Sequence, residues 1–199
     1  MVEKIKKTFS LLIIIILFLV YSTASNAKPL VFGDEKAKVT VRVFSSLTCP
    51  HCADLHEELF YNLKKDFIDS KKVKFIHHSF PLNYAALNAE KMLRCSNDPI
   101  KIFELMGEIY KKQSQWANGS DIEKINTSLI KIGESLNFNK DELKSCINNN
   151  KIQKEILNDR IKAQSEFEIS STPTIYINNK KFKDKLKYKI IKNRIEKIL

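Results

Sequence analysis

The strongest constraint on the fold is the order in which the hydrophobic pattern changes along the chain. Residues 39–44 and 73–80 are rich in the β-branched and aromatic side chains of strands, with helical spacing between them from Pro50 to about Lys65. Residues 84–167 then show helical spacing and no strand pattern. Strand spacing returns at 174–177, and a hairpin and an amphipathic helix follow. We therefore expect an α/β fold in which a helical insertion separates a β-α-β half from a β-β-α half.

The first 27 residues have the composition of an export signal. Three lysines within the first seven residues precede an apolar run from Phe9 to Val20, and small residues follow up to Ala27. This order is typical of a secretory signal peptide, and the apolar run is shorter than the ~20 residues that span a bilayer. We predict that residues 1–27 are a cleaved signal peptide, with a retained membrane anchor as the alternative. The mature protein would then work in an oxidising compartment outside the cytoplasm.

The two changes of pattern divide the rest of the chain. We expect the first part of the α/β unit at residues 28–82, a helical insertion at residues 83–168 and the second part at residues 169–199. Because the helical block lies between two halves of one sheet, we interpret it as an insertion and not as a separate domain.

The formal net charge of +11 suggests at first a nucleic-acid or anionic membrane partner. Nearly all of the basic excess is lysine, since arginine occurs only at positions 42, 94, 160 and 194. Arginine is the better bidentate partner of phosphates and base edges, so a basic excess that is nearly all lysine weakens this interpretation. The composition therefore argues against nucleic acid, and we expect no nucleic-acid partner.

The chemistry of the chain is concentrated in Cys49-Pro50-His51-Cys52, where the strand at 39–44 meets the following helix. Two cysteines at this spacing can bring their sulfur atoms within bonding distance. The helix N-terminus favours a thiolate at Cys49, Pro50 suits the first helical turn, and His51 can place positive charge near the sulfur. Because a stabilised thiolate makes the disulfide a strong oxidant, we predict a redox pair. Cys49 would be the nucleophile and Cys52, one turn later, the more buried resolving thiol.

Two other interpretations of these cysteines are open. Cys49 and Cys52 could form a structural disulfide. Alternatively, Cys52 and His56 are four residues apart and could bind zinc with His77 or His78. The sequence has no second Cys-x-x-Cys or His-x-His to complete four ligands, so we expect no metal and no organic cofactor. Adjacent strand residues point to opposite faces, so we interpret His77 and His78 as structural.

A second motif, Ser171-Thr172-Pro173-Thr174, directly precedes the strand at 174–177. With the Cys-Pro-His-Cys tetrapeptide it resembles the DsbA-type thiol:disulfide oxidoreductases found in the periplasm of α-proteobacteria. The resemblance covers nearly the whole chain after residue 27. It implies a thioredoxin fold with an inserted helical domain, an exposed sulfur at Cys49 and a cis-proline at Pro173 that faces the cysteine pair. Thr172 and Pro173 would then bind the extended substrate peptide. Supporting segments are Gly33-x3-Ala37-x-Val39-Thr40, Val73-Lys74-Phe75, Phe80-Pro81-Leu82 and Gln115-Trp116-Ala117.

Two positions depart from the pattern of this family. Many relatives carry a buried acidic residue six positions before the first cysteine, where this chain has Val43. Such a carboxylate assists proton transfer from the buried thiol, so the protonation route is in doubt. Thr172 is shared with isomerase and reductase members, whereas many strong oxidases have valine before the proline.

The remaining cysteines, Cys95 and Cys146, both fall in the helical insertion. In an oxidising compartment an even leftover pair indicates a structural disulfide, and related α-proteobacterial proteins carry a second disulfide in this region. The alternative is two buried thiols. We expect a Cys95–Cys146 disulfide that stabilises the fold and takes no part in exchange.

We therefore expect an oxidoreductase that donates disulfide bonds to cysteine-containing exported proteins. The resemblance also implies a quinone-linked membrane oxidase of the DsbB type as the partner that reoxidises the pair. The alternatives are a periplasmic isomerase or reductase that uses the same cysteines, and a non-catalytic metal- or peptide-binding module.

Overall fold

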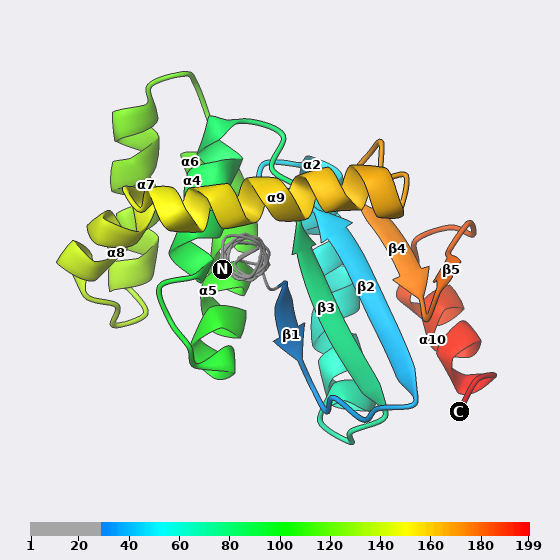
Figure 1. The fold of residues 1–199 in the computed structure, drawn as a ribbon. Coiled ribbons are helices and arrows are strands. Elements are labelled where there is room, and N and C mark those ends of the chain that lie inside the picture. Colours follow the sequence, from blue (N-terminus) through cyan, green and yellow to red (C-terminus); the bar gives the residue numbers. More distant parts are fainter. Residues whose placement is uncertain (1–28) are drawn as a thin grey trace, which may run out of the picture.

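The computed structural model describes residues 29–199, in which five strands form one mixed sheet in the order β1-β3-β2-β4-β5 (Figure 1). The parallel pair β2–β3 lies at its centre, and the other neighbouring strands are antiparallel. The strands are β1 (Leu30–Phe32), β2 (Val39–Ser45), β3 (Val73–Ser79), β4 (Thr174–Ile177) and β5 (Lys180–Lys181).

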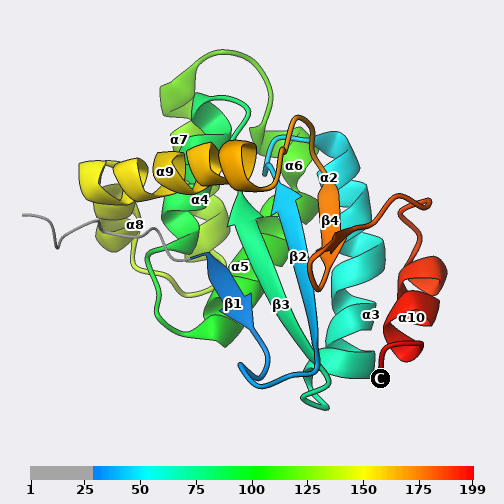
Figure 2. The same ribbon diagram turned by 45° about the vertical axis from the view of Figure 1, so that its right-hand side comes forward.

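Helices cover both faces of the sheet. One continuous helix, made of α2 (Pro50–Leu55), the π-helical segment η1 (His56–Phe60), α3 (Tyr61–Leu63) and the π-helical segment η2 (Lys64–Ile68), lies behind β2 and β3 (Figures 1 and 2). The long helix α9 (Asn150–Glu166) crosses in front of the strands and contacts β3. The C-terminal helix α10 (Tyr188–Glu196) packs beside α3. One face of the sheet is therefore covered by the Pro50–Ile68 helix, whereas α9 covers only one end of the opposite face (Figure 1).

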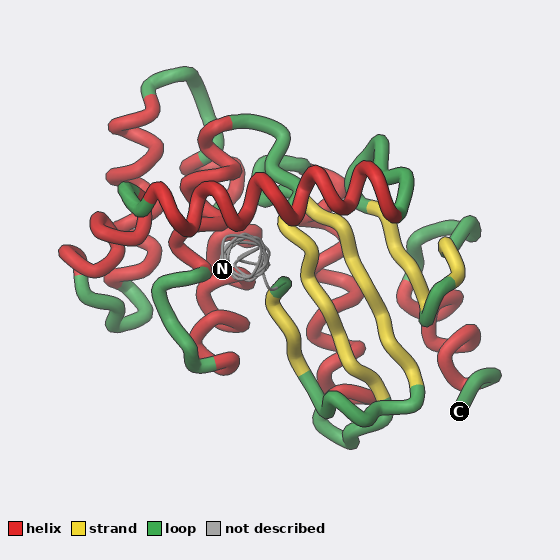
Figure 3. Tube along the Cα trace, in the orientation of Figure 1, coloured by secondary structure: helices red, strands yellow, loops and turns green. Residues whose placement is uncertain are grey.

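The helical insertion gathers at one side of the sheet, beyond β1 (Figure 3). It consists of α4 (Tyr84–Leu93), α5 (Pro99–Lys111), α6 (Gln113–Trp116), α7 (Ile122–Glu134) and α8 (Lys140–Ile147), and α9 leads back to the sheet. Apart from the short helix α6, these helices begin where side chains accept hydrogen bonds from the first-turn N–H groups. These residues are Asn83, Asp98, Asp121, Asn139 and Asn149. Each such cap contributes about 1 kcal/mol.

A single apolar core joins the sheet to the insertion. Val41 and Leu63 from the sheet side and Leu105 and Leu129 from the insertion belong to one cluster, and each is completely buried. Each buried side chain of this kind contributes about 1.5–3 kcal/mol. Phe44 lies on the other face of the sheet, in a smaller cluster with Ala163 of α9. The insertion therefore shares its core with the sheet.

The structure adds two features that the pattern did not predict. Strand β1 pairs antiparallel with β3 at the sheet edge, and its three residues are too few to show a strand period. The helix that begins at Pro50 continues to Ile68, beyond the expected end near Lys65. The predicted signal peptide at 1–27 lies outside the described residues, and the boundaries at 82 and 168 stay predictions. In the part of the chain that the structure describes, no helix is both long and apolar enough to cross a bilayer.

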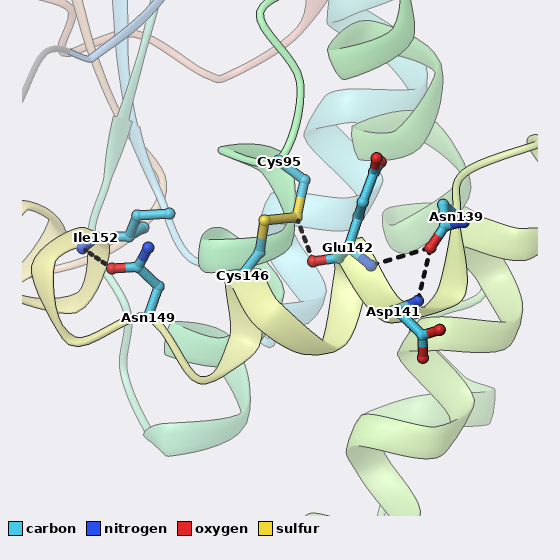
Figure 4. Close-up of a disulfide and its surroundings, with 7 residues drawn as sticks. All are labelled: Cys95, Asn139, Asp141, Glu142, Cys146, Asn149 and Ile152. Carbon is cyan, nitrogen blue, oxygen red and sulfur yellow. Dashed lines mark hydrogen bonds between the residues drawn. A yellow bond between two sulfur atoms is a disulfide. The ribbon is translucent and has the colours of Figure 1, made fainter.

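Cys95 and Cys146 are joined by a disulfide with a Cα–Cα distance of 5.8 Å (Figure 4). Cys95 follows α4, and Cys146 lies in the last turn of α8. The bond therefore ties the two ends of the segment that contains α5 and α7. It closes a loop of 51 residues, which lowers the conformational entropy of the unfolded chain.

Replacing both cysteines of this bond by serine is expected to lower the free energy of unfolding by about 2–4 kcal/mol. Disulfide exchange at Cys49 should be unchanged, since the bond lies in the insertion. Denaturant unfolding of the oxidised wild type and the double variant measures the first effect, and oxidation of a dithiol peptide measures the second. A folded double variant without exchange activity would contradict a purely structural role.

Candidate active site

The cysteine pair lies where the central strand β2 passes into the helix behind it. Cys49 is the N-cap residue of α2, and Pro50 occupies the first helical position, where the missing N–H is not needed. Both Cys49 and Cys52 are free thiols. Cys52 is 1% exposed and Cys49 5%, so the expected order of burial holds. The implied exposure of the Cys49 sulfur is wrong, because the loop that carries Thr172 covers it.

The register of the sheet brings the two motifs together. Strand β4 pairs antiparallel with β2, and Thr174 lies opposite Phe44 near the end of β2 that leads to Cys49. The Thr172–Pro173 peptide bond is cis. The Cys49 sulfur donates a hydrogen bond to the carbonyl oxygen of Thr172 at 3.5 Å, although 123 residues separate them in the chain. Because proline has no backbone N–H, Pro173 cannot donate a hydrogen bond to a neighbouring strand, and the backbone beside the Cys49 sulfur is left available.

The His51 side chain lies at the protein surface. Its ring is 85% exposed, and its Nδ1 atom lies 4.0 Å from a carboxylate oxygen of Asp54. Pro173, His51 and Asp54 all border a surface hollow of about 320 Å3. The hollow places the cis-proline next to the first turn of α2. A role for His51 at the Cys49 sulfur stays a prediction.

Cys52 is held in an environment that disfavours its thiolate. Burial raises the pKa of the Cys52 thiol to about 12, and the neighbouring Cys49 adds to the increase. Hydrogen bonds from the Ser45 hydroxyl and the Ser46 backbone lower the pKa without cancelling the effect of burial. Cys52 is therefore protonated in the reduced pair at neutral pH. The burial and raised pKa of Cys52 fit the predicted role of resolving thiol, and the roles of nucleophile for Cys49 and resolving thiol for Cys52 stay predictions.

Three polar residues of the site were not predicted from the sequence. Gln113 donates from its side-chain amide to the carbonyl oxygens of Leu47 and Cys49, at 2.9 and 3.1 Å. Ser45 and Tyr110 share a buried hydrogen bond of 2.8 Å between their hydroxyl oxygens. Gln113 and Tyr110 come from the insertion, so only the fold brings them to the cysteines. Ser45 ends β2, and a serine at that place carries no signal of its own.

His56 is buried in the same region, where its sequence position had suggested a zinc ligand. Burial, followed by the nearby His77, lowers the pKa of His56 to about 3. Among the described residues, no group of three or more His, Cys, Asp or Glu side chains is placed to hold a metal ion. His77 and His78 point to opposite faces, His77 to Glu90 at 3.0 Å and His78 to Asp159 at 3.3 Å.

The low pKa of His56 predicts a loss of stability in acid. Below pH 6.5 the unfolded chain binds a proton at His56 that the folded protein excludes down to about pH 3. Stability from this group is therefore complete above pH 6.5 and falls as the pH falls through that window. Between pH 6.5 and 4.5 the loss should be about 2–3 kcal/mol, and it should be absent in His56→Gln. Denaturant unfolding of both proteins at the two pH values tests this, and equal losses would contradict it.

A family model described as thioredoxin matches residues 25–197. The chain belongs to the thioredoxin family. Disulfide bond formation protein D of Bacillus subtilis is 30% identical over 183 residues, which cover 85% of this chain and 76% of that protein. A Rickettsia conorii protein named a protein-disulfide oxidoreductase is 29% identical over 149 residues, 75% of this chain and 53% of its own length. The chain thus spans about half the length of the Rickettsia relatives that it matches.

Solved structures place the chain among the DsbA-type members of the thioredoxin family. α-DsbA1 of Wolbachia pipientis superimposes with a TM-score of 0.79 at 27% identity, over 90% of this chain and 94% of that one. BdbD of Bacillus subtilis superimposes with a TM-score of 0.74 at 26% identity, over 85% and 92%. The prediction of a DsbA-type thioredoxin fold with a helical insertion is therefore confirmed.

Proposed function

We propose that this DsbA-type protein is a thiol:disulfide oxidoreductase that donates the Cys49–Cys52 disulfide to cysteine pairs of exported proteins. The observation that carries the proposal is the contact between the Cys49 sulfur and the Thr172 carbonyl, beside the cis-proline. It places a cysteine at the start of a helix against a short unpaired backbone segment. A substrate peptide bound there in extended form would bring its own cysteine to Cys49.

The exchange begins when a substrate thiolate attacks the Cys49 sulfur of the oxidised pair. The Cys49–Cys52 bond breaks, its electron pair stays on Cys52, and Cys49 is joined to the substrate in a mixed disulfide. Cys52 takes up a proton because its pKa is about 12. A second substrate thiolate then attacks the substrate sulfur of the mixed disulfide and releases Cys49 as a thiolate. Two electrons have passed from the substrate to the pair.

Export and reoxidation complete the proposed cycle. We propose that residues 1–27 direct the chain to the periplasm and that a quinone-linked membrane oxidase of the DsbB type reoxidises the pair. The relatives named disulfide bond formation protein and the DsbA-type structures support the exchange chemistry. The export step rests on the signal-like composition of residues 1–27, and the DsbB-type partner rests on the family resemblance. Accumulation of the reduced pair in cells that lack such an oxidase would test the second step.

The reduction potential of the Cys49–Cys52 pair distinguishes a protein that donates disulfide bonds from one that reduces them. Equilibration with glutathione buffers, followed by alkylation and mass mapping, resolves this pair from Cys95–Cys146. We expect a potential well above that of the glutathione pool. A value near −270 mV, as in thioredoxin, would contradict donation and favour a reductase. Isomerase activity is the second candidate because of Thr172, and refolding of a scrambled disulfide substrate measures it.

The non-catalytic alternative needs its own measurement. A metal- or peptide-binding module would bind through Cys49 without exchanging disulfides. Full exchange by a metal-free sample would exclude that function, whereas bound metal that is lost in Cys49→Ser would support it.

A further inference from the structure

A small cavity of about 20 Å3 lies directly beside Cys52, and every residue that lines it is buried. Its polar lining consists of Ser45, Cys52, His56, His77 and Tyr110, and the rest is apolar. A volume of this size holds one water molecule, provided that polar groups surround it. Val43 also lines the cavity, and none of the described lining residues carries a carboxylate.

One polar atom in this lining has no partner. The Nε2 atom of His56 is buried and forms no hydrogen bond with any residue in the described part of the chain. The ring is 8% exposed and packs against the Tyr110 ring with their centroids 4.6 Å apart. A buried nitrogen without a partner costs about 1–3 kcal/mol, and one water molecule in the cavity would supply such a partner.

His56 and Tyr110 also form the wall between this cavity and the surface. Both residues line an open cleft of about 560 Å3, which begins at Pro50 beside the cysteine pair. No other residue borders both spaces, among those that the structure describes. The charged groups that face the cleft are Asp54, Glu57, Glu108 and Lys111. On the inner side, His77 is hydrogen-bonded to Glu90 at 3.0 Å.

Ser45 connects this wall to the reacting sulfur. The Tyr110 hydroxyl lies 2.8 Å from the Ser45 hydroxyl, and Ser45 lines the small cavity together with Cys52. Hydroxyl groups both donate and accept, and a neutral imidazole accepts a proton on one nitrogen as it releases one from the other. A chain of hydroxyl groups and a neutral imidazole can therefore pass a proton along, and each group returns to its neutral form afterwards.

We propose that His56 and Tyr110 carry protons between the open cleft and Cys52, through Ser45 and one water molecule in the cavity. The proposal rests on the proposed exchange function. When the Cys49–Cys52 bond breaks, the Cys52 thiolate takes a proton from Ser45 or the water, which is replaced through the wall from the cleft. When Cys52 attacks a mixed disulfide, its proton leaves by the same route. The relay residues are returned unchanged, and one proton is exchanged with solvent.

The release of glutathione from a mixed disulfide at Cys49 tests this relay directly. In that step the Cys52 thiol loses its proton, the thiolate attacks the Cys49 sulfur, and glutathione leaves with the electron pair. Removing a positioned proton acceptor slows such a step by about tenfold or more. We therefore expect Tyr110→Phe and His56→Ala to release glutathione at least about ten times more slowly at pH 7. Their deficit should shrink as the pH rises, because hydroxide then removes the proton.

A matched control and a rescue distinguish the relay from packing. Tyr176→Phe removes a hydroxyl that bonds the Phe167 carbonyl at 2.8 Å, away from the cavity, and should keep the wild-type rate. Imidazole can enter the space left by His56→Ala from the cleft and should restore the rate, whereas pyrrole, a ring of the same size with no acceptor nitrogen, should not. Equal rescue by both rings, or wild-type rates and pH profiles in both relay variants, would overturn the relay. A wild-type protein that releases no glutathione would instead overturn the proposed function.

Discussion

Cys49→Ser is expected to abolish disulfide exchange, with a loss of roughly a thousandfold or more, as when other enzymes lose their nucleophile. Serine cannot form the mixed disulfide through which every exchange passes. Cys52→Ser should have a different effect, because it keeps the nucleophile and removes the thiol that resolves the intermediate. The Cys52 variant should therefore accumulate protein–substrate mixed disulfides.

The structure supports this assignment of roles to the two cysteines. Cys49 is the N-cap residue of α2 and contacts the Thr172 carbonyl, where a substrate peptide would bind. Cys52 is almost completely buried and has a pKa of about 12, so it is poorly placed to meet a substrate thiol.

Oxidation of a fluorescent dithiol peptide measures the loss in Cys49→Ser, and non-reducing gels with mass spectrometry detect the trapped species in Cys52→Ser. The Cys95→Ser/Cys146→Ser double variant is the matched control, since it also removes two sulfur atoms and should retain exchange. Trapped species in Cys49→Ser and none in Cys52→Ser would reverse the two roles.

The local parts of this site could be predicted because their chemistry is encoded in adjacent residues. Cys49-Pro50-His51-Cys52 and Thr172-Pro173 are short motifs beside strand patterns, and the antiparallel pairing of β2 with β4 is sufficient to bring them together. The fold class followed in the same way from the change of hydrophobic period. Strand β1 did not, since three residues carry no period.

The surroundings of Cys52 could not be predicted in this way. Tyr110 and Gln113 lie in α5 and just after it, where they fit a helical pattern like any other polar or aromatic residue. Their contacts with the redox pair depend on how α5 packs against the Pro50–Ile68 helix. The sequence suggests only a zinc-ligand role for His56, because the spacing of His56 from Cys52 is visible in the sequence and its contact with Tyr110 is not.

Glu90 is another residue whose contacts could not be predicted from the sequence, and its replacement has the largest expected effect on stability. It lies in the middle of α4 and is completely buried. Its carboxylate accepts a hydrogen bond of 2.7 Å from the Ser79 hydroxyl and lies 3.0 Å from the Nε2 atom of His77. Arg94 donates to the same Ser79 hydroxyl at 3.1 Å. This buried network connects the first helix of the insertion, α4, to strand β3.

Glu90→Ala is therefore expected to lower the free energy of unfolding by about 3–5 kcal/mol, because it leaves buried polar groups of β3 without their partner. Glu134→Ala is the matched control, since it makes the same change at an exposed position at the end of α7 and should alter stability by less than about 0.5 kcal/mol. Urea unfolding of the three proteins, with equal slopes, measures both effects. A loss in Glu90→Ala no larger than that of the control would mean that apolar packing alone, and not this network, holds the insertion on the sheet.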